Sequence, residues 1–258
     1  MRVLAVIPAR LGSTRLPEKP LATLRGRPLV EYAWRAARRA RRPARVVIAT
    51  ESETVASVAR DFGAEVVLTS AAHASGSDRV AEVAAQLSEF DAVVNVQGDE
   101  PLLDPAALDA AVAALEEDAR ADAATLAHWE DDAGAWLRPE VVSVEIDAAG
   151  YATGFARGRA AHPGPLPFLR HVGLYAYRRA VLLAFASWPP TAAERAVSLE
   201  QLRLLEHGLK MRVVVTSYRS HAVDTAADLA FLESNWDRLA APVGPPRHPS
   251  PSRPESPQ

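Results

Sequence analysis

In the first 120 residues, short apolar runs alternate four times with segments of helical spacing, and this alternation constrains the fold more than any other feature. The runs have the composition of strands buried on both faces, and the helical segments begin at a proline or a short polar residue. The runs are Val3–Ile7, Arg45–Thr50, Glu65–Thr69 and Asp91–Val96. The alternation predicts βαβ units and a parallel sheet, whose right-handed crossovers place the carboxyl ends of the strands at one edge.

The second half of the chain has a different pattern, because strand-like segments follow one another directly. They are Asp122–Trp129, Val141–Ile146, Tyr151–Ala156 and Leu169–Tyr177. After them we expect a helix from Thr191 to about His207, a strand over Met211–Ser217 and a last helix from Ala226 to about Leu239. We therefore predict an α/β fold, with a mostly parallel, Rossmann-like sheet, helices on both faces and a smaller mixed or antiparallel region.

Composition excludes several classes of function. The net charge of −3 gives no attraction to nucleic acid, so we expect no nucleic-acid partner. The chain has no cysteine, which excludes disulfides, thiolate catalysis and zinc–sulfur sites. Neither a secretory signal nor an apolar run of about 18 residues is visible, so we expect a cytoplasmic protein with no membrane partner. Seven prolines lie between Pro242 and Pro257, and residues 241–258 are expected to form a disordered tail.

The loop after the first strand, Pro8–Leu21, is polar and basic. It carries Arg10, Arg15 and Lys19, and Gly12 allows a ligand to approach the backbone closely. A loop at the carboxyl end of a parallel strand is a common ligand site, and its cations would suit a polyphosphate. It matches neither G-x-x-x-x-G-K-[ST] nor G-x-G-x-x-G, and an ordinary basic surface loop is the alternative.

Two carboxylates are candidates for a metal site. Asp99 follows a strongly apolar strand, in the tight turn Gln97–Pro101, and is expected at the same sheet edge as the basic loop. Asp224 also follows a strand and precedes a helix, where a helix N-cap or an ordinary turn residue is the alternative interpretation. One or two carboxylates together with substrate phosphates are the usual ligands of Mg²⁺.

Six segments in order resemble the 3-deoxy-manno-octulosonate (Kdo) cytidylyltransferases and cover about residues 1 to 236. They are IPARLGSTRLPEKPL from Ile7, HASGSDR from His73, VNVQGDEP from Val94, FLRHVGLYAYRR from Phe168, LEQLR from Leu199 and VDTAADL from Val223. The resemblance implies a Mg²⁺-dependent enzyme that transfers a cytidylyl group from CTP to the anomeric hydroxyl of Kdo. It also implies one domain over residues 1–240, with a nucleotide half to about 120, a sugar-binding and dimerisation region over about 121–215, and a homodimer.

The resemblance assigns roles to individual residues. Arg10, Ser13 and Lys19 would hold the triphosphate, and Asp99 and Asp224 would bind Mg²⁺; Arg10, Lys19, Asp99 and Asp224 would be catalytic. The cytosine end would meet Ser75, Gly76, Arg79 and Gln97. The acidic sugar would meet Arg157, His171, Tyr175, Glu200 and Gln201. For His171 and Tyr175 packing on a strand is the alternative, and for Glu200 and Gln201 a solvated helix face.

The chain departs from the family pattern on the sugar side. The segment Gly158–Pro165 is shorter than usual and lacks the basic residue at the matching position, and Val197 stands where an acidic residue is usual. Ser77 and Asp78 replace the usual Thr and Glu. Three other functions therefore stay open: CMP activation of a modified Kdo or a sialic-acid-like sugar, nucleotidyl transfer to a sugar phosphate, and CTP binding without catalysis.

Overall fold

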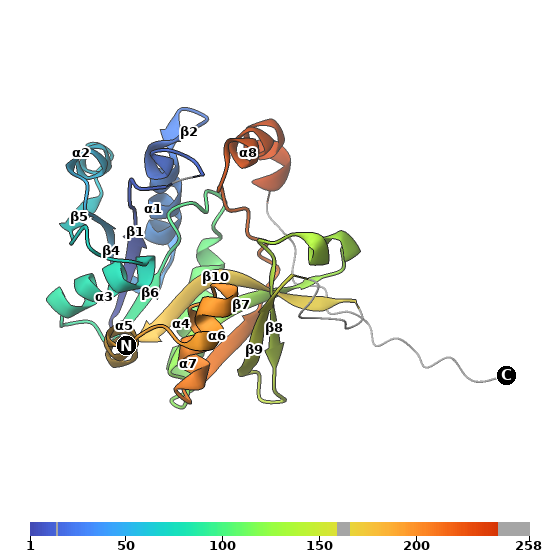
Figure 1. Ribbon diagram of the computed structural model, residues 1–258. Coiled ribbons are helices and arrows are strands. Elements are labelled where there is room, and N and C mark those ends of the chain that lie inside the picture. The colour runs from blue at the N-terminus through green and yellow to red at the C-terminus, as the bar shows by residue number, and fades with distance from the viewer. Residues whose placement is uncertain (14, 159–165, 242–258) are drawn as a thin grey trace.

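The computed structural model describes residues 1–13, 15–158 and 166–241. Its main sheet has nine strands, with the order β11-β7-β10-β6-β1-β4-β5 and with β8 joined to β10 and β9 (Figure 1). The strands of the first half are β1 (Val3–Pro8), β4 (Pro43–Thr50), β5 (Glu65–Leu68) and β6 (Ala92–Asn95). Those of the second half are β7 (Ala123–Glu130), β8 (Val142–Ile146), β9 (Ala152–Arg157), β10 (Phe168–Arg178) and β11 (Met211–Val215).

The strand directions confirm the predicted mixture. Strands β6, β1, β4 and β5 are mutually parallel, as are β11 and β7, while β10 runs antiparallel to both of its neighbours β6 and β7. Strands β8 and β9 form an antiparallel pair attached to β10. The sheet is therefore parallel where the chain alternates between strand and helix, and mixed where strands follow one another directly.

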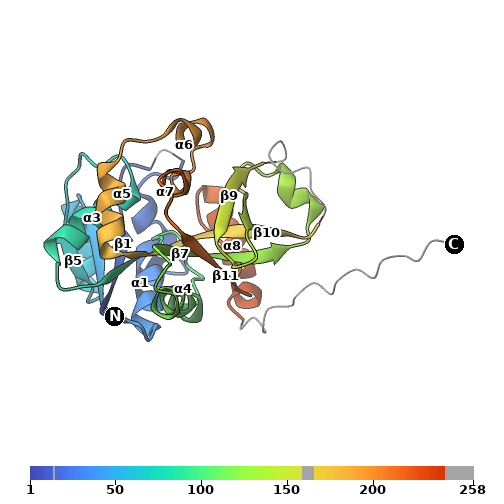
Figure 2. The ribbon, with the colours of Figure 1, turned by 90° about the horizontal axis from the view of Figure 1, so that it is seen from below.

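Both faces of the sheet are covered, which explains why β1 is apolar at every position. Val3, Ala5 and Ile7 belong to a core on one face, whereas Leu4 and Val6 belong to a core on the other. The first face packs against α1 (Leu29–Arg39), α2 (Glu53–Asp61) and α4 (Pro105–Glu117). The second packs against α3 (Gly76–Gln86), α5 (Arg179–Ser187) and α7 (Gln201–Glu206), as Figure 2 shows from below.

The order of strands places a switch point between β1 and β6. Strand β1 has β4, the next long strand in the chain, on one side and β6 on the other. Such a reversal opens a crevice at the carboxyl ends of the two strands. The backbones approach closely there, since a Cβ added to Gly98 would lie 3.3 Å from the carbonyl oxygen of Pro8. The basic loop and the turn that holds Asp99 consequently leave the sheet side by side.

The last helix, α8 (Ala226–Leu239), returns to this edge. Leu232 of α8 and Val223 just before it pack with Leu24 and Leu29 in a small separate core. Leu24 belongs to a hairpin of two short strands, β2 (Thr23–Leu24) and β3 (Arg27–Pro28), which the sequence did not predict. This packing brings Asp224, which directly precedes α8, close to the basic loop, where its Oδ1 lies 2.7 Å from Lys19 Nζ.

One predicted helix is wrong in its extent. The segment from Thr191 to His207 is two short helices, α6 (Ala192–Val197) and α7. Ser198 ends α6 in a left-handed conformation, with φ at 54°, and Leu199 beyond it is buried. Arg203 of α7 folds back onto Glu194 of α6, with Nε 2.7 Å from Oε2. Burial of Leu199 and this buried ion pair override the continuous helical pattern.

Other differences are smaller. Helix α5 and the short 3₁₀ helices η1 (Lys19–Leu21) and η2 (Ala133–Leu137) were not predicted. The predicted tail beyond residue 241 and residues 159–165 of the segment that departs from the family pattern lie outside the described residues. Among the helices that the structure does describe, none is long and apolar enough to cross a membrane.

Candidate active site

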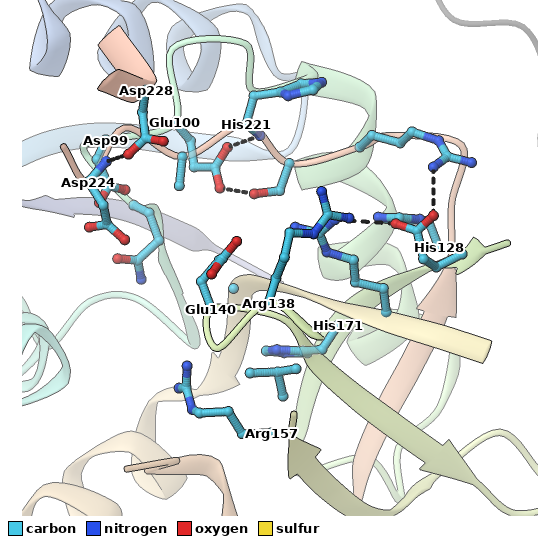
Figure 3. Close-up of a pocket in the computed structure, with 18 of the residues that line it drawn as sticks. Asp99, Glu100, His128, Arg138, Glu140, Arg157, His171, His221, Asp224 and Asp228 are labelled. Atoms are coloured by element: carbon cyan, nitrogen blue, oxygen red, sulfur yellow. Dashed lines mark hydrogen bonds and ion pairs between the residues drawn. The ribbon is translucent and has the colours of Figure 1, made fainter. Parts of the chain in front are cut away.

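Lys19 joins the two carboxylates that the sequence singled out. Its Nζ lies 2.7 Å from Oδ1 of Asp224 and also contacts Oδ2 of Asp99. The side chain of Lys19 is 15% exposed, that of Asp224 31% and that of Asp99 23%, so all three are partly shielded from water and still open to a ligand. Figure 3 shows Asp99 and Asp224 close together at the edge of a cavity. Residues 205 positions apart in the chain thus meet on one ammonium group.

The structure excludes the alternative interpretation of Asp224 as a helix cap. Thr225 caps α8, with its hydroxyl accepting from the Asp228 N–H while the Asp228 carboxylate accepts from the Thr225 N–H. The Asp224 carboxylate therefore faces the basic loop. Its Oδ1 contacts both Lys19 and Arg15, whose Nη2 lies 3.0 Å away.

The surroundings favour the charged form of Lys19. Burial disfavours the ammonium, but the negative charges of Asp99 and Asp224 and their hydrogen bonds outweigh it and raise the pKa of Lys19 above its usual value. Lys19 therefore supplies a fixed positive charge at neutral pH.

The residues predicted to meet the nucleotide surround the same edge of the sheet. Arg10 and Ser13 lie in the loop after β1, and Gln97 lies between β6 and Asp99 and lines the cavity. Ser75 caps α3, whose N-terminus approaches the loop, since a Cβ on Gly76 would lie 3.4 Å from the Pro8 ring. Helix α3 begins at Gly76, directly after a capping box formed by Ser75 and Asp78.

Arg79 is held within the protein. It is 3% exposed, its Nη2 lies 2.7 Å from Oε2 of Glu51, and its Nη1 donates to the Ser70 carbonyl oxygen and to the Thr69 hydroxyl. These contacts connect α3 to the ends of β4 and β5. Arg79 accordingly fixes the shape of the predicted cytosine loop. Nothing in the sequence indicated that Glu51 would pair with Arg79.

All five residues predicted to meet the sugar line the cavity that Asp99 and Asp224 also line. They are Arg157, His171, Tyr175, Glu200 and Gln201. The cavity is open and has a volume of about 1000 Å³, in the upper part of the range for small-molecule sites. The sequence-predicted groups from β9, β10 and α7 therefore share one space with the basic loop.

Arg157 makes three bonds to backbone carbonyl oxygens. Its Nε, Nη1 and Nη2 lie 3.2, 3.0 and 3.3 Å from the oxygens of Val197, Pro139 and Ser198. The guanidinium thereby ties β9 to the break between α6 and α7. Figure 3 shows the side chain on the wall of the cavity, and its bonds to neutral carbonyl oxygens leave its positive charge uncompensated by them.

His171 and Tyr175 are both packed on β10 and also line the cavity, so their packing does not exclude the predicted contact with a ligand. The His171 ring packs edge-on against Phe155 and lies close to Tyr175. Its Nε2 is 2.9 Å from the Thr125 hydroxyl. Burial, and to a lesser extent Arg157, lowers the pKa of His171 to about 3, and burial raises the pKa of Tyr175 above its usual value. Both are neutral at pH 7.

This gives a prediction for stability against pH. In the unfolded chain His171 takes up a proton below about pH 6.5, but in the folded chain it stays neutral down to about pH 3. The unfolding free energy therefore falls as the pH drops between these two values. His171→Gln should reduce the loss between pH 7 and 4.5 by about 1–3 kcal/mol. Urea unfolding of the parent and of His171→Gln, each at pH 7 and at pH 4.5, measures the loss of unfolding free energy in each protein. Equal losses in the variant and the parent would contradict the assignment.

Glu200 connects the sugar side with the nucleotide side. Its Oε1 accepts from the hydroxyl of Ser77 on α3, and the Asn95 Nδ2 lies 3.4 Å from the same hydroxyl. Ser77 and Asn95 are each 1% exposed. Burial raises the pKa of Glu200. Glu200 is thus half-buried with its carboxylate bonded to a buried hydroxyl, and Gln201 is 3% exposed, so neither residue lies on a solvated helix face.

Removal of the Ser77 hydroxyl should disturb the sugar side selectively. Ser77→Ala leaves the Glu200 carboxylate without its buried donor, at a cost of about 1–3 kcal/mol. We expect KM for the acidic sugar to rise by about tenfold and KM for CTP to stay within about twofold. Ser77→Thr keeps the hydroxyl and should restore the parent value. A Ser77→Ala enzyme with an unchanged KM for the sugar would contradict this role.

The sequence analysis missed the charged groups at the far end of the cavity. Glu130, 3% exposed, pairs with Arg170 at 3.2 Å and with Arg219 at 3.6 Å. Neighbouring His128 is buried, which lowers its pKa to about 4. A charged residue at the end of an apolar strand, such as Glu130 as the last residue of β7, was the available signal.

The two carboxylates fit a divalent cation that also binds phosphate. Asp99 and Asp224 already converge on one positive charge, which shows that their oxygens can approach a single centre. Within the described ranges, no group of three or more His, Asp or Glu side chains forms a complete metal cage. This donor set resembles those that hold Mg²⁺ through one or two carboxylates and substrate oxygens.

Comparison with known proteins agrees with this geometry. The family model described as "Cytidylyltransferase" matches residues 4–211. The 3-deoxy-manno-octulosonate cytidylyltransferase of Geobacter sulfurreducens is 43% identical over 89% of this chain and 97% of its own. That of Chlorobium chlorochromatii is 44% identical over 91% and 96%.

A solved structure of CMP:2-keto-3-deoxy-manno-octonic acid synthetase complexed with CTP has the same fold. It is 34% identical, with a TM-score of 0.86 over 92% of this chain and 99% of that one. The fold, the continuous family match and the near full-length similarity lead to one conclusion: the chain belongs to the 3-deoxy-manno-octulosonate cytidylyltransferase family.

Proposed function

We propose that this protein transfers the cytidylyl group of CTP to the anomeric hydroxyl of Kdo, with CMP-Kdo and pyrophosphate as products. The observation that carries the proposal is the meeting of Lys19, Asp99 and Asp224 at the edge of a cavity large enough for both substrates. Near full-length similarity to proteins named for this reaction supports Kdo over other acidic 3-deoxy sugars. The product would serve the synthesis of lipopolysaccharide or a related glycan.

CTP binds at the crevice between β1 and β6. The triphosphate meets Arg10, Ser13 and Lys19, and the cytosine end lies toward Ser75, Gly76 and Gln97. Arg79 contributes by holding that loop in shape through Glu51 and Ser70. Support comes from the common position of these residues at the carboxyl ends of the two strands.

The acidic sugar binds on the opposite wall. Arg157 attracts its carboxylate, and the sugar hydroxyls meet His171, Tyr175, Glu200 and Gln201. These side chains are held by neighbours, as Glu200 is by Ser77 and His171 by Thr125, which favours a defined orientation of the sugar. His171, with a pKa of about 3, is too weak a base to take the proton of the sugar hydroxyl at neutral pH.

The reaction needs positioning and charge neutralisation more than covalent work by the protein. The anomeric hydroxyl attacks the α-phosphorus of CTP in line, and pyrophosphate leaves. Asp99 and Asp224 would hold Mg²⁺, the divalent metal we propose in a family that generally uses one. When bound, Mg²⁺ supplies positive charge to the phosphate oxygens. Lys19 and Arg10 add fixed positive charge where negative charge develops.

We also propose a homodimer, formed through the region of about residues 121–215, and a cytoplasmic location, where CTP is available. One polypeptide domain over residues 1–240 carries both substrate sites. A sedimentation velocity run at several protein concentrations would detect the dimer.

The function is tested by pyrophosphate release from CTP and Mg²⁺ with different acceptors. The proposal predicts rapid release with Kdo, slow release with a sialic acid, and none with a sugar phosphate or without an acceptor. Faster pyrophosphate release with a sialic-acid-like sugar than with Kdo would show that the substrate is that sugar and not Kdo. CTP binding in calorimetry without release for any acceptor would refute catalysis.

A further inference from the structure

Glu100 is a buried carboxylate whose role the proposed reaction does not explain. It directly follows Asp99 and is 7% exposed. Its Oε2 accepts from the Tyr218 hydroxyl at 2.9 Å and from the His221 N–H at 3.1 Å, and its Oε1 accepts from the Ser220 hydroxyl. Figure 3 shows Glu100 turned toward this stretch of chain. All of these bonds go to one short segment.

That segment, residues 216–225, connects β11 to α8. It has no helix or strand of its own, so its course depends on what it is bonded to. Besides the three bonds to Glu100, the Val223 N–H donates to the Asp99 carbonyl oxygen at 3.0 Å. Asp224 is the next residue. The turn after β6 therefore holds the segment at two points, directly before the second carboxylate of the site.

A carboxylate is a costly choice for a purely structural contact. Its removal from water is unfavourable unless every oxygen is bonded, and here three donors are arranged around it. An acceptor that bonds two hydroxyls and a backbone N–H fixes the segment more closely than apolar packing would.

We propose that Glu100 is a positioning residue that sets Asp224 against Asp99, and so determines how tightly the pair holds the divalent cation with CTP. The inference rests on the proposed function, in which Asp99 and Asp224 bind that cation. Glu100 itself acts only through the segment 218–223. Outer contacts of this kind typically alter metal affinity by about 10–100-fold when removed.

Calorimetry of CTP binding, once with Mg²⁺ and once with EDTA, tests this without relying on turnover. The ratio of the two affinities measures the contribution of the cation. In Glu100→Ala we expect this ratio to fall by about tenfold or more, with the affinity in EDTA within about twofold of the parent. Glu100→Gln keeps an acceptor oxygen and should retain most of the ratio.

Two further variants keep the test decisive. Tyr218→Phe with Ser220→Ala removes two donors and leaves Glu100 in place, so it should lower the ratio even if Glu100→Ala does not fold. Glu31→Gln is a matched control, because Glu31 is also 7% exposed but bonds to Arg35 on α1, and its ratio should equal the parent's. An unchanged ratio in Glu100→Ala or the double variant would overturn the inference. A parent protein that does not bind CTP would instead refute the proposed function.

Discussion

Asp99→Asn is expected to lower kcat by about a thousandfold or more, a loss of about 4 kcal/mol of transition-state stabilisation. The amide has the shape of the carboxylate but no charge, so it is a poor ligand for Mg²⁺ and a poor partner for Lys19. Pyrophosphate release with saturating CTP, Mg²⁺ and Kdo measures the effect.

The fold should survive this substitution. The Asp99 side chain is 23% exposed, and the bond that holds Val223 comes from the Asp99 backbone, which the variant keeps. A melting temperature within a few degrees of the parent, together with lost turnover, is the expected pair of results. Near-normal turnover of Asp99→Asn would refute the metal role of Asp99.

Lys19→Met is expected to have the second largest effect, a fall in kcat/KM of about 10²–10³-fold. The substitution removes the positive charge that lies between Asp99 and Asp224, and with it a proposed contact to the triphosphate. It also removes a competitor for the two carboxylates. Without nucleotide, Mn²⁺ should therefore bind more tightly to Lys19→Met than to the parent, as followed by the electron paramagnetic resonance signal of free Mn²⁺.

Arg15→Met is the matched control for this prediction. Arg15 contacts the same oxygen of Asp224 at 3.0 Å, but its side chain is 64% exposed, and exposed pairs contribute little. Its loss should change kcat/KM by less than about tenfold. If Arg15→Met and Lys19→Met lowered activity equally, the special position of Lys19 between the carboxylates would be contradicted.

The parallel half of the fold was predictable from sequence because its signals are local. Strand β1 is apolar throughout since both of its faces are covered, and Ser52 and Pro105 mark helix starts where the structure has α2 and α4. From the sequence alone, the tendency of ligand sites to lie at the carboxyl ends of parallel strands also places Asp99 beside the basic loop.

Features that depend on distant contacts were not predictable. The break at Ser198 follows from the Glu194–Arg203 pair and the burial of Leu199, none of which disturbs the helical spacing. The donors around Glu100 come from residues 118 or more positions away. A sequence shows that such residues are polar, but it does not show which of them meet.

In the site, too, the sequence indicated which residue types are present but not what each of them contacts. The resemblance assigned Arg157 and Arg79 to ligands, and the structure gives both of them bonds within the protein, to the carbonyl oxygens near Ser198 and to Glu51. Arg157 still faces the cavity, whereas Arg79 supports a loop. An arginine has five donors, and a sequence does not reveal how they are divided between ligand and protein.

The most direct test of the account is a crystal structure with CTP and Mn²⁺, analysed by anomalous scattering at the manganese edge. The account predicts a manganese peak in contact with carboxylate oxygens of both Asp99 and Asp224 and with an oxygen of the CTP α-phosphate. A peak that contacts neither carboxylate, or CTP bound away from the crevice between β1 and β6, would contradict it.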